Sequence, residues 1–466
     1  MTEAKIPQHI SVTGRVQDWL SNPENRLPVS CTTFNVKDSM EGKDGIEDSW
    51  IFVSKALRHA AGVAINLSEL RPSGSSNGKG LVSSGPCSFA QIYSKLNETL
   101  RRGGVYKNGA ITLYLDYDHP DIEEYLNLSP SQIPWAKRAV YVDENLMNSP
   151  HIDLIVQRLR DGSIWLNKKQ YDKNGDRLYG NVCQEIYIKS RGTCLLIHTN
   201  LGSTKIKDIP KAFEQGMKFL CSLHKKTGVG KSGIYLKPSE DKQVGLGAIG
   251  LSNLLAIEKV TYAEFVDALE WILDYDGEID RPTKLSKAEQ IAVALKEGYD
   301  RAAVVARKHG MERAFTIAPT ATCSYRYKDR DGYTTSPEIS PPNCHPVTKS
   351  VIRESETFGD IPYDYHPNCQ TTTDVEWETQ YRLMKAWQRL MDSTGLAHAI
   401  SFNIWDKAGV NKDFVADWLS SSLKSTYYSL KTNQFALDKS KVAEAEDVSE
   451  PIACGLDAQH CTSCSE

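Results

Sequence analysis

The sequence predicts an α/β fold in which helices surround a largely buried sheet. Segments with apolar residues at helical spacing alternate along the chain with short, continuous apolar runs that are typical of buried strands. When strands and helices alternate in this way, the helices pack on the faces of a sheet. The 466 residues exceed an ordinary domain but match the size of the larger α/β barrels.

The individual elements follow from local patterns. Three apolar runs, at 110–115, 315–318 and 399–404, are expected to be core strands, and Pro120 is expected to open a short acidic helix. The longer helical patterns extend over residues 50–60, 88–101, 143–159, 210–225, 261–274, 286–308 and 375–394. Residues 439–466 are polar and rich in Ala and acidic residues, which predicts a mobile tail.

Composition argues against several functions. The formal net charge is −4, so no basic field favours nucleic acid or an anionic membrane surface. No apolar run is long enough to cross a bilayer, and the first residues do not resemble a signal peptide. Eleven cysteines cannot all pair within the chain, and without a secretory signal they indicate reduced thiols in a cytosol. We therefore expect a cytoplasmic protein.

A short motif places an amide, a thiol and a carboxylate at alternate positions: Asn181, Cys183 and Glu185. Alternate side chains of an extended segment share a face, so all three would point at one substrate. A carboxylate can take a proton from a hydroxyl, an amide can hold a neighbouring oxygen, and a sulfur can act on the carbon between them. The alternative is a surface loop with a buried structural cysteine, because a free Cys often serves as a small apolar residue.

Other motifs occur in a fixed order around this one. Cys31 follows Pro-Val-Ser, Cys194 opens a run that ends in Asn-Leu-Gly, and the chain closes on Cys461 and Cys464. The remaining motifs are at 61–67, 70–75, 83–86, 101–104, 119–126 and 318–322. From about Pro28 to the C-terminus, this series resembles the large, catalytic subunit of ribonucleotide reductase.

The resemblance implies a fold and a domain organisation. It implies a ten-stranded α/β barrel over 21–438, with Cys183 on a finger loop at its centre, and a redox-active tail over 439–466. Residues 1–20 would form only a short segment. They leave no room for the N-terminal ATP-binding cone of many relatives, so on/off control by ATP and dATP is not expected.

The resemblance also assigns roles to the central residues. Cys183 would be the thiyl radical that takes the 3′ hydrogen of the ribose. Glu185 would remove the 3′-hydroxyl proton, and Asn181 would hydrogen-bond to the substrate hydroxyls. Cys31 and Cys194 would face the 2′ carbon, protonate the departing hydroxyl, supply two electrons and close a disulfide. The product would be a 2′-deoxyribonucleotide.

The terminal cysteines fit this chemistry, because a buried disulfide cannot meet an external reductase. Cys461 and Cys464 would exchange with it and pass the electrons on from a thioredoxin- or glutaredoxin-type protein. The alternative for this CxxC pair is half of a zinc site, with Cys454 and His460 as the only nearby candidates for further ligands. No metal site is assigned.

Substrate contacts are expected in two places. Hydroxyl and N–H groups at a turn after the 315–318 strand can bind phosphate, although without the resemblance the same residues would be an ordinary helix cap. Cys323 and the segment 334–341, which lacks the usual Gly-Ile-Glu-Pro ending, depart from the family pattern. The residues expected to contact substrate are Ser30, Ala61, Gly62, Thr320, Ala321, Thr322, Cys323 and Ser324.

Two further segments resemble the site that binds a deoxynucleotide effector such as thymidine triphosphate. Residues 73–80 match the first specificity loop and 101–109 the second. In the second loop Tyr-Lys-Asn at 106–108 replaces the usual arginine-glycine pattern, so the effector-to-substrate code is not predicted. The expected contacts are Asp38 near the sugar and base, Arg71 on phosphate, and Ser75, Lys79, Arg101 and Arg102. Without the resemblance, the last three would be solvated charges.

The radical source is predicted from a tyrosine pair. Tyr427 and Tyr428, between Lys424 and Ser429, resemble the pair that relays oxidation from a metal-containing β subunit in class I enzymes. This favours diphosphate substrates, a β-subunit partner and no directly bound cofactor, and family members of this type usually form homodimers. The alternatives are an adenosylcobalamin-dependent class II enzyme, in which the two tyrosines would only pack, and the glycyl-radical class, whose motif is absent from the C-terminal region.

Two glycine-rich segments resemble nucleotide motifs without their context. A GxGxxG at 245–250 is followed by residues expected to be helical through 261–274, and the family places a packing helix here. Segment 228–232 resembles a phosphate loop, but Lys225 stands where its first glycine belongs. Neither is assigned a cofactor.

A competing hypothesis is a non-catalytic nucleotide-binding relative, which would have lost at least one of the central reactive residues. Cys31, Cys183, Cys194 and Glu185 are all present. The sequence therefore favours an active enzyme.

Overall fold

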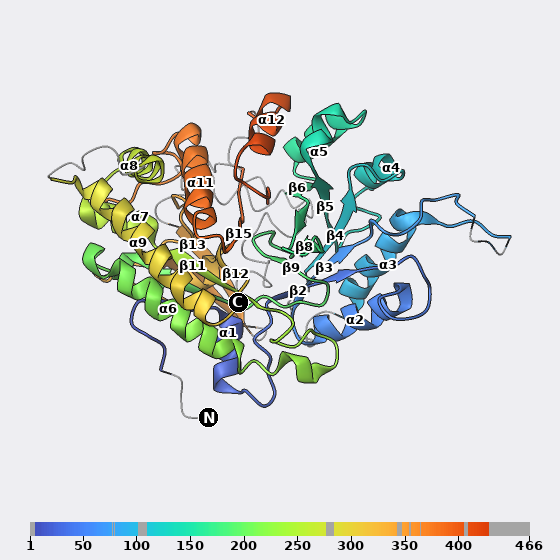
Figure 1. The fold of residues 1–466 in the computed structure, drawn as a ribbon, viewed down its shortest axis with the longest axis horizontal. Coiled ribbons are helices and arrows are strands. Elements are labelled where there is room, and N and C mark those ends of the chain that lie inside the picture. Colours follow the sequence, from blue (N-terminus) through green and yellow to red (C-terminus); the bar gives the residue numbers. More distant parts are fainter. Residues whose placement is uncertain are drawn as a thin grey trace.

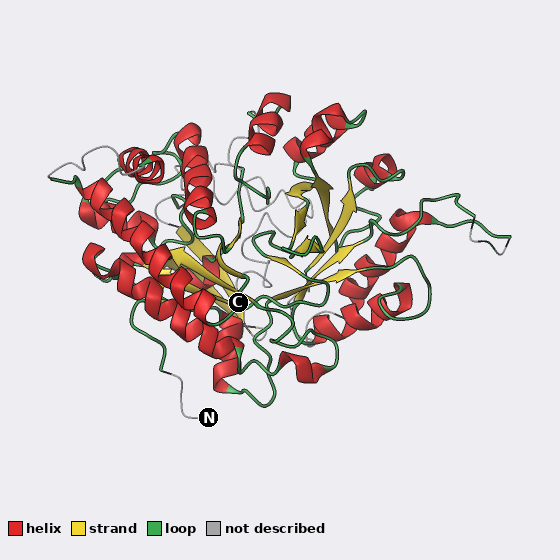
Figure 2. Cartoon of the chain, viewed as in Figure 1, coloured by secondary structure: helices red, strands yellow, loops and turns green. Residues whose placement is uncertain are grey.

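Two five-stranded sheets form the centre of the molecule, and helices cover their outer faces (Figures 1 and 2). The computed structural model describes residues 5–76, 78, 80–100, 110–275, 284–342, 347–353, 356–363, 365–404 and 409–427. The α/β class predicted from the alternating apolar patterns is confirmed. No helix within these ranges is long and apolar enough to cross a membrane.

The first sheet contains consecutive strands in the order β2-β3-β4-β5-β6, and all neighbours are parallel. Parallel neighbours need a long connection, and each connection here contains a helix. The strands are β2 (Cys31–Asn35), β3 (Gly62–Asn66), β4 (Ile111–Asp116), β5 (Lys137–Val142) and β6 (Trp165–Lys168), and the helices are α2 (Ile46–Arg58), α3 (Gly85–Thr99), α4 (Ile122–Asn127) and α5 (Ile152–Asp161).

The second sheet has the order β1-β10-β11-β12-β15, in which β1 is antiparallel and the other four strands are parallel. The strands are β1 (Ile10–Val12), β10 (Leu196–Asn200), β11 (Gln243–Ile249), β12 (Arg313–Ile317) and β15 (Ala397–Ile400). The longer helices between them are α6 (Ile209–His224), α7 (Leu251–Glu258), α8 (Tyr262–Asp274), α9 (Lys287–Lys308) and α11 (Trp377–Asp392).

Shorter elements complete the described chain. A three-stranded and a two-stranded antiparallel sheet lie outside the large sheets. They involve β7 (Gln170–Tyr171), β8 (Arg177–Gly180) and β9 (Tyr187–Ile188), and β13 (Val347–Arg353) with β14 (Glu356–Tyr363). The other helices are α1 (Gly14–Ser21), α10 (Ala321–Tyr325), α12 (Lys412–Ser420) and the 3-10 helices η1 (Glu144–Asn148), η2 (Leu201–Ser203), η3 (Ile206–Asp208) and η4 (Val229–Ser232).

The two faces of each sheet belong to different buried clusters. On β3, Val63 and Ile65 pack in the large core with the helices, whereas Ala64 between them belongs to a second cluster. This division follows from the two-residue period of a strand. The second cluster also contains Leu196 of β10 and Ala399 of β15, so the inner faces of both sheets share one interior.

Hydrogen bonds join the two sheets at both edges. Beside β6, the backbone N–H of Thr426 donates to Leu166 O over 2.8 Å, and that of Tyr427 donates to Phe402 O over 2.7 Å. At the other edge, Thr32 of β2 forms an isolated antiparallel bridge with Thr193, just before β10. Segments of the second half of the chain therefore flank both edge strands of the first sheet.

The helix boundaries predicted from the sequence agree best with the structure where a capping box marks the first turn of the helix. α8 begins after Thr261 and α9 after Ser286, and each cap side chain accepts the N–H of a Glu three residues on, whose carboxylate accepts the cap N–H in return. The single helix predicted over 143–159 is wrong. A 3-10 helix ends at Asn148 and α5 starts at Ile152, because Pro150 lies between them.

Three smaller expectations are corrected by the structure. The acidic helix after Pro120 starts at Ile122 rather than at the proline. The helical stretch expected after the GxGxxG segment is confirmed as α7 and α8, whereas residues 245–249 of the segment itself, which the resemblance placed in a packing helix, belong to β11. The 228–232 segment forms the 3-10 helix η4 and does not join a strand to a helix. Residues 439–466 lie outside the described part of the chain.

Candidate active site

The tip of a short hairpin, residues 181–186, lies between the two sheets (Figure 1). It connects β8 to β9, which pair antiparallel. All six tip residues are buried, and Gln184 adopts a positive φ of 67°. The tip is therefore a tight turn held in the interior, rather than the extended segment considered for this motif.

Tyrosines of the first sheet hold one side of the hairpin. The hydroxyl of Tyr114 donates to Asn181 O over 2.6 Å, and the hydroxyl of Tyr141 accepts the N–H of Gly180 over 2.8 Å. The two rings stack with centroids 4.6 Å apart. A Cβ at Gly180 would come within 2.8 Å of Asn167 Oδ1, so only glycine allows the hairpin to approach this closely.

The second sheet holds the other side through carbonyl groups of the tip. The carbonyl of Glu185 accepts the N–H of Ala399 over 2.9 Å and the hydroxyl of Thr316 over 2.8 Å. The carbonyl of Gln184 accepts the hydroxyl of Ser425 over 2.9 Å. Because both sheets bind the same few residues, the backbone of the tip is fixed before any ligand arrives.

This turn brings the predicted trio together. Nδ2 of Asn181 donates to Oε1 of Glu185 over 2.8 Å, and both side chains are buried. Cys183 lies between them in the chain, belongs to the same buried cluster and is disulfide-bonded in this structure. A carboxylate oriented by an amide can take up a proton from a hydroxyl, and the Cys183 sulfur, once reduced, can act on the adjacent carbon.

Cys31 and Cys194 meet at the edge of the same interior. Sγ of Cys194 accepts the backbone N–H of Cys31 over 2.8 Å, and the N–H of Cys194 donates to Cys31 O over 3.0 Å. Both are buried, reduced thiols in the cluster that contains Cys183. The fold therefore gathers three cysteines that are far apart in the sequence.

The expected substrate contacts near the start of β3 lie beside this pair. Gly62 is the register partner of Cys31, and its N–H donates to Ser30 O over 2.8 Å. Ser30 and Ala61 are buried next to them in the chain. These residues form the wall of the interior on the Cys31 side.

The expected phosphate segment has the predicted strand–turn–helix form, since β12 ends at Ile317 and α10 begins at Ala321. The hydroxyl of Thr320 accepts the N–H of Glu338 over 2.8 Å, and the N–H of Ser324 donates to Thr320 O over 2.9 Å. Burial raises the pKa of the Cys323 thiol to about 12. The departure from the family pattern at Cys323 therefore adds no negative charge at neutral pH.

Sequence reasoning missed Glu338, a second buried carboxyl near the hairpin. Its Oε2 accepts Nδ2 of Asn403 at 3.5 Å, and its backbone has a positive φ of 55°, which is unusual for a residue with a side chain. Burial raises the pKa of Glu338 to about 8, and the charge of nearby Glu185 adds to this effect. The available signal was a lone acid within the uncharged stretch 334–342.

Comparisons with known proteins agree with this geometry. Residues 29–150 match the family described as "Ribonucleotide reductase, barrel domain". A solved structure, "Actinobacillus ureae class Id ribonucleotide reductase alpha subunit", superposes with a TM-score of 0.62 at 18% identity and covers 92% of this chain and 88% of that one. Residues 29–150 are therefore similar to the ribonucleotide reductase barrel family, and the superposition shows that the chain shares the fold of a large subunit.

Curated relatives carry the same family name. The "Vitamin B12-dependent ribonucleotide reductase" of Bradyrhizobium diazoefficiens is 28% identical over 145 residues, which are 31% of this chain and 11% of that protein. The "Vitamin B12-dependent ribonucleoside-diphosphate reductase" of Thermoplasma acidophilum is 24% identical over 336 residues, 60% of this chain and 43% of that protein. The chain thus spans less than half the length of these curated relatives.

The tyrosine pair expected to carry radicals lies only partly within the described residues. Tyr427 is buried in the cluster with Cys183, and its ring packs on Trp165 with centroids 4.8 Å apart. The ammonium group of Lys424 donates to Asp392 over 2.8 Å, and burial lowers its pKa. Tyr428 lies outside the described residues, as do Cys461 and Cys464.

The residues expected to bind an effector come together in part. Nε of Arg71 lies 2.7 Å from Oδ2 of Asp38, and Nη1 donates to Ser76 O over 3.1 Å. Ser75 is exposed in the loop that follows. The structure does not describe Lys79, Arg101 or Arg102, nor the side chains of Ala321 and Thr322 at the phosphate turn.

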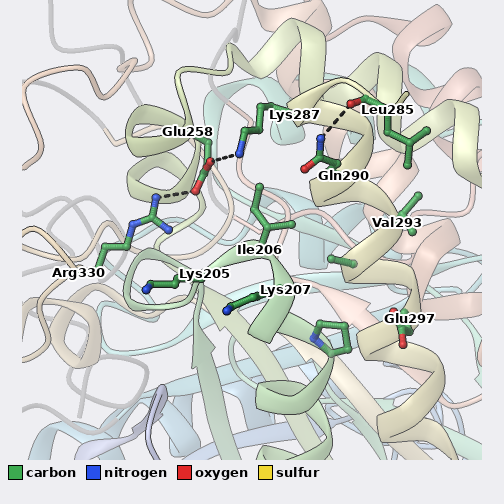
Figure 3. Close-up of a pocket in the computed structure, with 12 residues that line it drawn as sticks. Lys205, Ile206, Lys207, Glu258, Leu285, Lys287, Gln290, Val293, Glu297 and Arg330 are labelled. Carbon is green, nitrogen blue, oxygen red and sulfur yellow. Dashed lines mark hydrogen bonds and ion pairs between the residues drawn. The ribbon is translucent and has the colours of Figure 1, made fainter. Parts of the chain in front are cut away.

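Elsewhere, a pocket of about 590 Å³ lies between η3, α7 and α9 (Figure 3). Glu258 there binds Arg330 and Lys287. The pocket contains none of the predicted catalytic residues. Among the described side chains, no group of three His, Cys, Asp or Glu is placed to hold a metal ion.

Proposed function

We propose that this chain is the catalytic subunit of a ribonucleoside-diphosphate reductase. The observation that carries the proposal is one buried cluster containing Cys31, Cys183 and Cys194, with the hydrogen-bonded Asn181 and Glu185 on the same turn. The reaction converts a ribonucleoside diphosphate and two thiols to a 2′-deoxyribonucleoside diphosphate, water and a disulfide.

The proposed steps use these groups in order. The Cys183 thiyl takes the 3′ hydrogen atom, and Glu185 takes the 3′-hydroxyl proton while Asn181 orients its carboxylate. The 2′-hydroxyl leaves as water with a proton from the Cys31–Cys194 pair. The pair then gives its second proton and two electrons as its S–S bond forms, so that a C–H bond replaces the C–O bond at the 2′ carbon. Glu185 returns its proton to the 3′ oxygen, and the hydrogen atom held by Cys183 returns to the 3′ carbon, which restores the thiyl radical.

Substrate binding is proposed at the two places already described. Ser30, Ala61 and Gly62 would contact the nucleotide beside Cys31, and residues 320–324 would bind its phosphates. The high pKa of Cys323 supports this role, because a neutral thiol does not repel a phosphate. Asp38 and Arg71 would hold a deoxynucleotide effector.

A closed ten-stranded barrel over 21–438 is part of this proposal. The hydrogen bonds of Thr426 and Tyr427 at one edge, and the Thr32–Thr193 bridge at the other, support closure of the two sheets around the hairpin tip. A redox tail over 439–466, a thioredoxin- or glutaredoxin-type reductant and a homodimer complete it. Burying the tip in a closed interior would keep water away from a radical.

For the radical source, we propose class I chemistry with a separate metal-containing β subunit. Tyr427 and Trp165 pack together beside the cysteine cluster, which fits a relay through side chains. The vitamin B12-dependent names of the curated relatives favour the second candidate, an adenosylcobalamin enzyme. That cofactor would generate the radical directly at Cys183, without a relay through Tyr427.

Reduction of GDP tests both candidates. The purified chain is assayed with thymidine triphosphate and dithiothreitol, either with adenosylcobalamin alone or with a metal-loaded β subunit. Product only with the β subunit supports class I, and product with adenosylcobalamin alone establishes class II. No dGDP with either source would contradict the reductase proposal.

A further inference from the structure

The segment that carries Cys194 is clamped by two buried side chains at the start of β11. Oδ2 of Asp241 accepts the backbone N–H of Thr193 over 2.8 Å and Nε2 of Gln243 over 3.2 Å. Nε2 of Gln243 also donates to the carbonyl of Thr193 over 2.5 Å. Both backbone groups of Thr193 are therefore bound by one linked pair of side chains.

The clamp lies directly against the backbone before Cys194. A Cβ on Gly192 would sit 2.9 Å from Lys189 O and 3.2 Å from Oδ1 of Asp241. Only glycine leaves space for the carboxylate at this distance. Asp241 itself is 5% exposed, so solvent cannot replace the hydrogen bond to Thr193.

The position of Thr193 determines where the next sulfur lies. Cys194 donates its N–H to Cys31 O, and its Sγ accepts the Cys31 N–H over 2.8 Å. The hydrogen bond to Sγ fixes the sulfur of Cys194 beside the backbone of Cys31. The clamp thus sets where the sulfur of Cys194 lies relative to Cys31.

We propose that Asp241 is a positioning residue that holds Cys194 against Cys31, so that the sulfur of Cys194 is the one that attacks when the redox pair is oxidised. This inference rests on the redox role given to the pair under the proposed function. When a small disulfide oxidises the pair, the thiolate of Cys194 attacks one sulfur of the reagent, forms a mixed disulfide and releases the other sulfur as a thiolate. Cys31 then loses its proton and attacks the sulfur of Cys194. This forms the Cys31–Cys194 bond and releases the second thiolate of the reagent, so two electrons leave the protein.

The charge state of Asp241 makes the clamp sensitive to pH. Burial raises the pKa of Asp241 to about 6, against the opposing effects of the Thr193 and Gln243 hydrogen bonds. The titratable groups around it are Cys194, Lys189, which pairs with Asp172 at 3.1 Å, and His224, which lies 2.8 Å from Asp241 O through Nε2. Burial lowers the pKa of His224, so it stays neutral near pH 6. Above pH 6 the ionised Asp241 accepts the hydrogen bonds from Thr193 and Gln243 more strongly than the protonated carboxyl does below pH 6.

The test measures disulfide formation between Cys31 and Cys194 in the reduced full-length chain treated with oxidised dithiothreitol. Asp241→Ala removes the acceptor, whereas Asp241→Asn keeps an oxygen that can accept from Thr193 without the charge. A matched control is Asp329→Ala, which removes a carboxylate of similar burial, 6% exposed, that accepts the N–H groups of Asp331 and Tyr333. Peptide mapping gives the rate and thermal unfolding reports stability.

We expect Asp241→Ala to slow disulfide formation about tenfold, the effect of one lost hydrogen bond. At pH 7.5 the rate of disulfide formation in Asp241→Asn is expected to stay within about threefold of the rate in the unmodified chain. The change in that rate near pH 6, which we expect in the unmodified chain as Asp241 titrates, is expected to be absent. Asp329→Ala would lower the unfolding temperature without changing the rate.

Unchanged kinetics in Asp241→Ala would overturn the inference and leave the proposed function standing. If Asp241→Ala does not fold, an Asp241→Asn chain that keeps the rate change near pH 6 would overturn it equally. Absence of a Cys31–Cys194 disulfide in the unmodified chain would instead contradict the redox role itself.

Discussion

The two ends of β2 and β3 differ in how they hold their functional residues. At the amino ends, Cys31 and Gly62 are buried register partners, and many hydrogen bonds from both sheets fix the neighbouring hairpin. At the carboxyl ends, roughly 15 Å away along the five-residue strands, Asp38 and Arg71 form one half-exposed ion pair. The first end is suited to chemistry that needs fixed geometry, and the second to a ligand that must come and go.

The largest effect is expected at the apex of the hairpin. Replacing Cys183 with Ala removes the atom that starts the reaction, so dGDP formation is expected to fall to background. Thymidine triphosphate binding, measured by equilibrium dialysis, is expected to stay unchanged because Asp38 and Arg71 lie at the other end of the sheet. Residual turnover in Cys183→Ala would show that another residue starts the chemistry.

A smaller loss is expected when Glu185 is replaced by Gln. The amide keeps the size of the side chain but cannot accept a proton, and a general base typically contributes about 10² to 10⁴ in rate. We expect kcat to fall by that factor with KM nearly unchanged. Wild-type kcat in Glu185→Gln would exclude Glu185 as the base, and Glu214→Gln on the surface of α6 serves as a control for charge removal.

Support of the hairpin by the first sheet is tested by Tyr114→Phe. The change removes only the hydroxyl that donates to Asn181 O. It is expected to lower the free energy of unfolding by about 1 kcal/mol and to reduce kcat several-fold, because the carbonyl stays buried. Chemical denaturation and steady-state assays measure the two effects. A stability loss with full kcat would mean that the tip does not need this anchor.

The pH dependence tests the second acid. The folded-state pKa of Glu338, about 8, lies above the ordinary value of 4.5, so its contribution to stability is fully present below about pH 4.5 and is lost as pH rises to about 8. We therefore expect the unfolding temperature to fall between about pH 5 and 8 and to level off above that, and Glu338→Gln to flatten the fall. An identical pH profile in Glu338→Gln would assign the effect to other groups.

The smallest effect on the enzyme itself is expected at the effector end. Arg71→Ala breaks a half-exposed ion pair, which contributes about 0–1 kcal/mol to stability. Basal GDP reduction is expected to stay within twofold, whereas stimulation by thymidine triphosphate is expected to be lost. If basal turnover fell as strongly as in Glu185→Gln, the two ends of the strands would not be separate sites.

Much of the fold could be predicted because it depends on local signals. Apolar spacing and capping pairs such as Ser286 with Glu289 lie within a few residues of one another. The error at 143–159 came from overlooking Pro150, which is also a local signal. The strand at 243–249 was missed because its small, glycine-rich residues resemble neither a helix nor a typical strand.

The sequence predicted only those residues of the site that lie in recognisable motifs. The trio, Cys31 and Cys194 were expected, but their meeting depends on contacts between residues more than 150 positions apart. Asp241 and Glu338 were missed because neither lies in a reactive pattern. Their significance comes from burial and from partners such as Thr193 and Thr320, which only the folded chain brings near.

The most direct test of the central claim is a single turnover without external reductant. The reduced chain is mixed with GDP, thymidine triphosphate and whichever radical source supports multiple turnover, then quenched and mapped for disulfides. For the first turnover, the account predicts one dGDP per active site with an equal amount of the Cys31–Cys194 disulfide, and exchange with the reduced tail pair allows at most one further turnover. Full dGDP formation while Cys31 and Cys194 remain reduced, with no disulfide passed to Cys461 and Cys464, would contradict it.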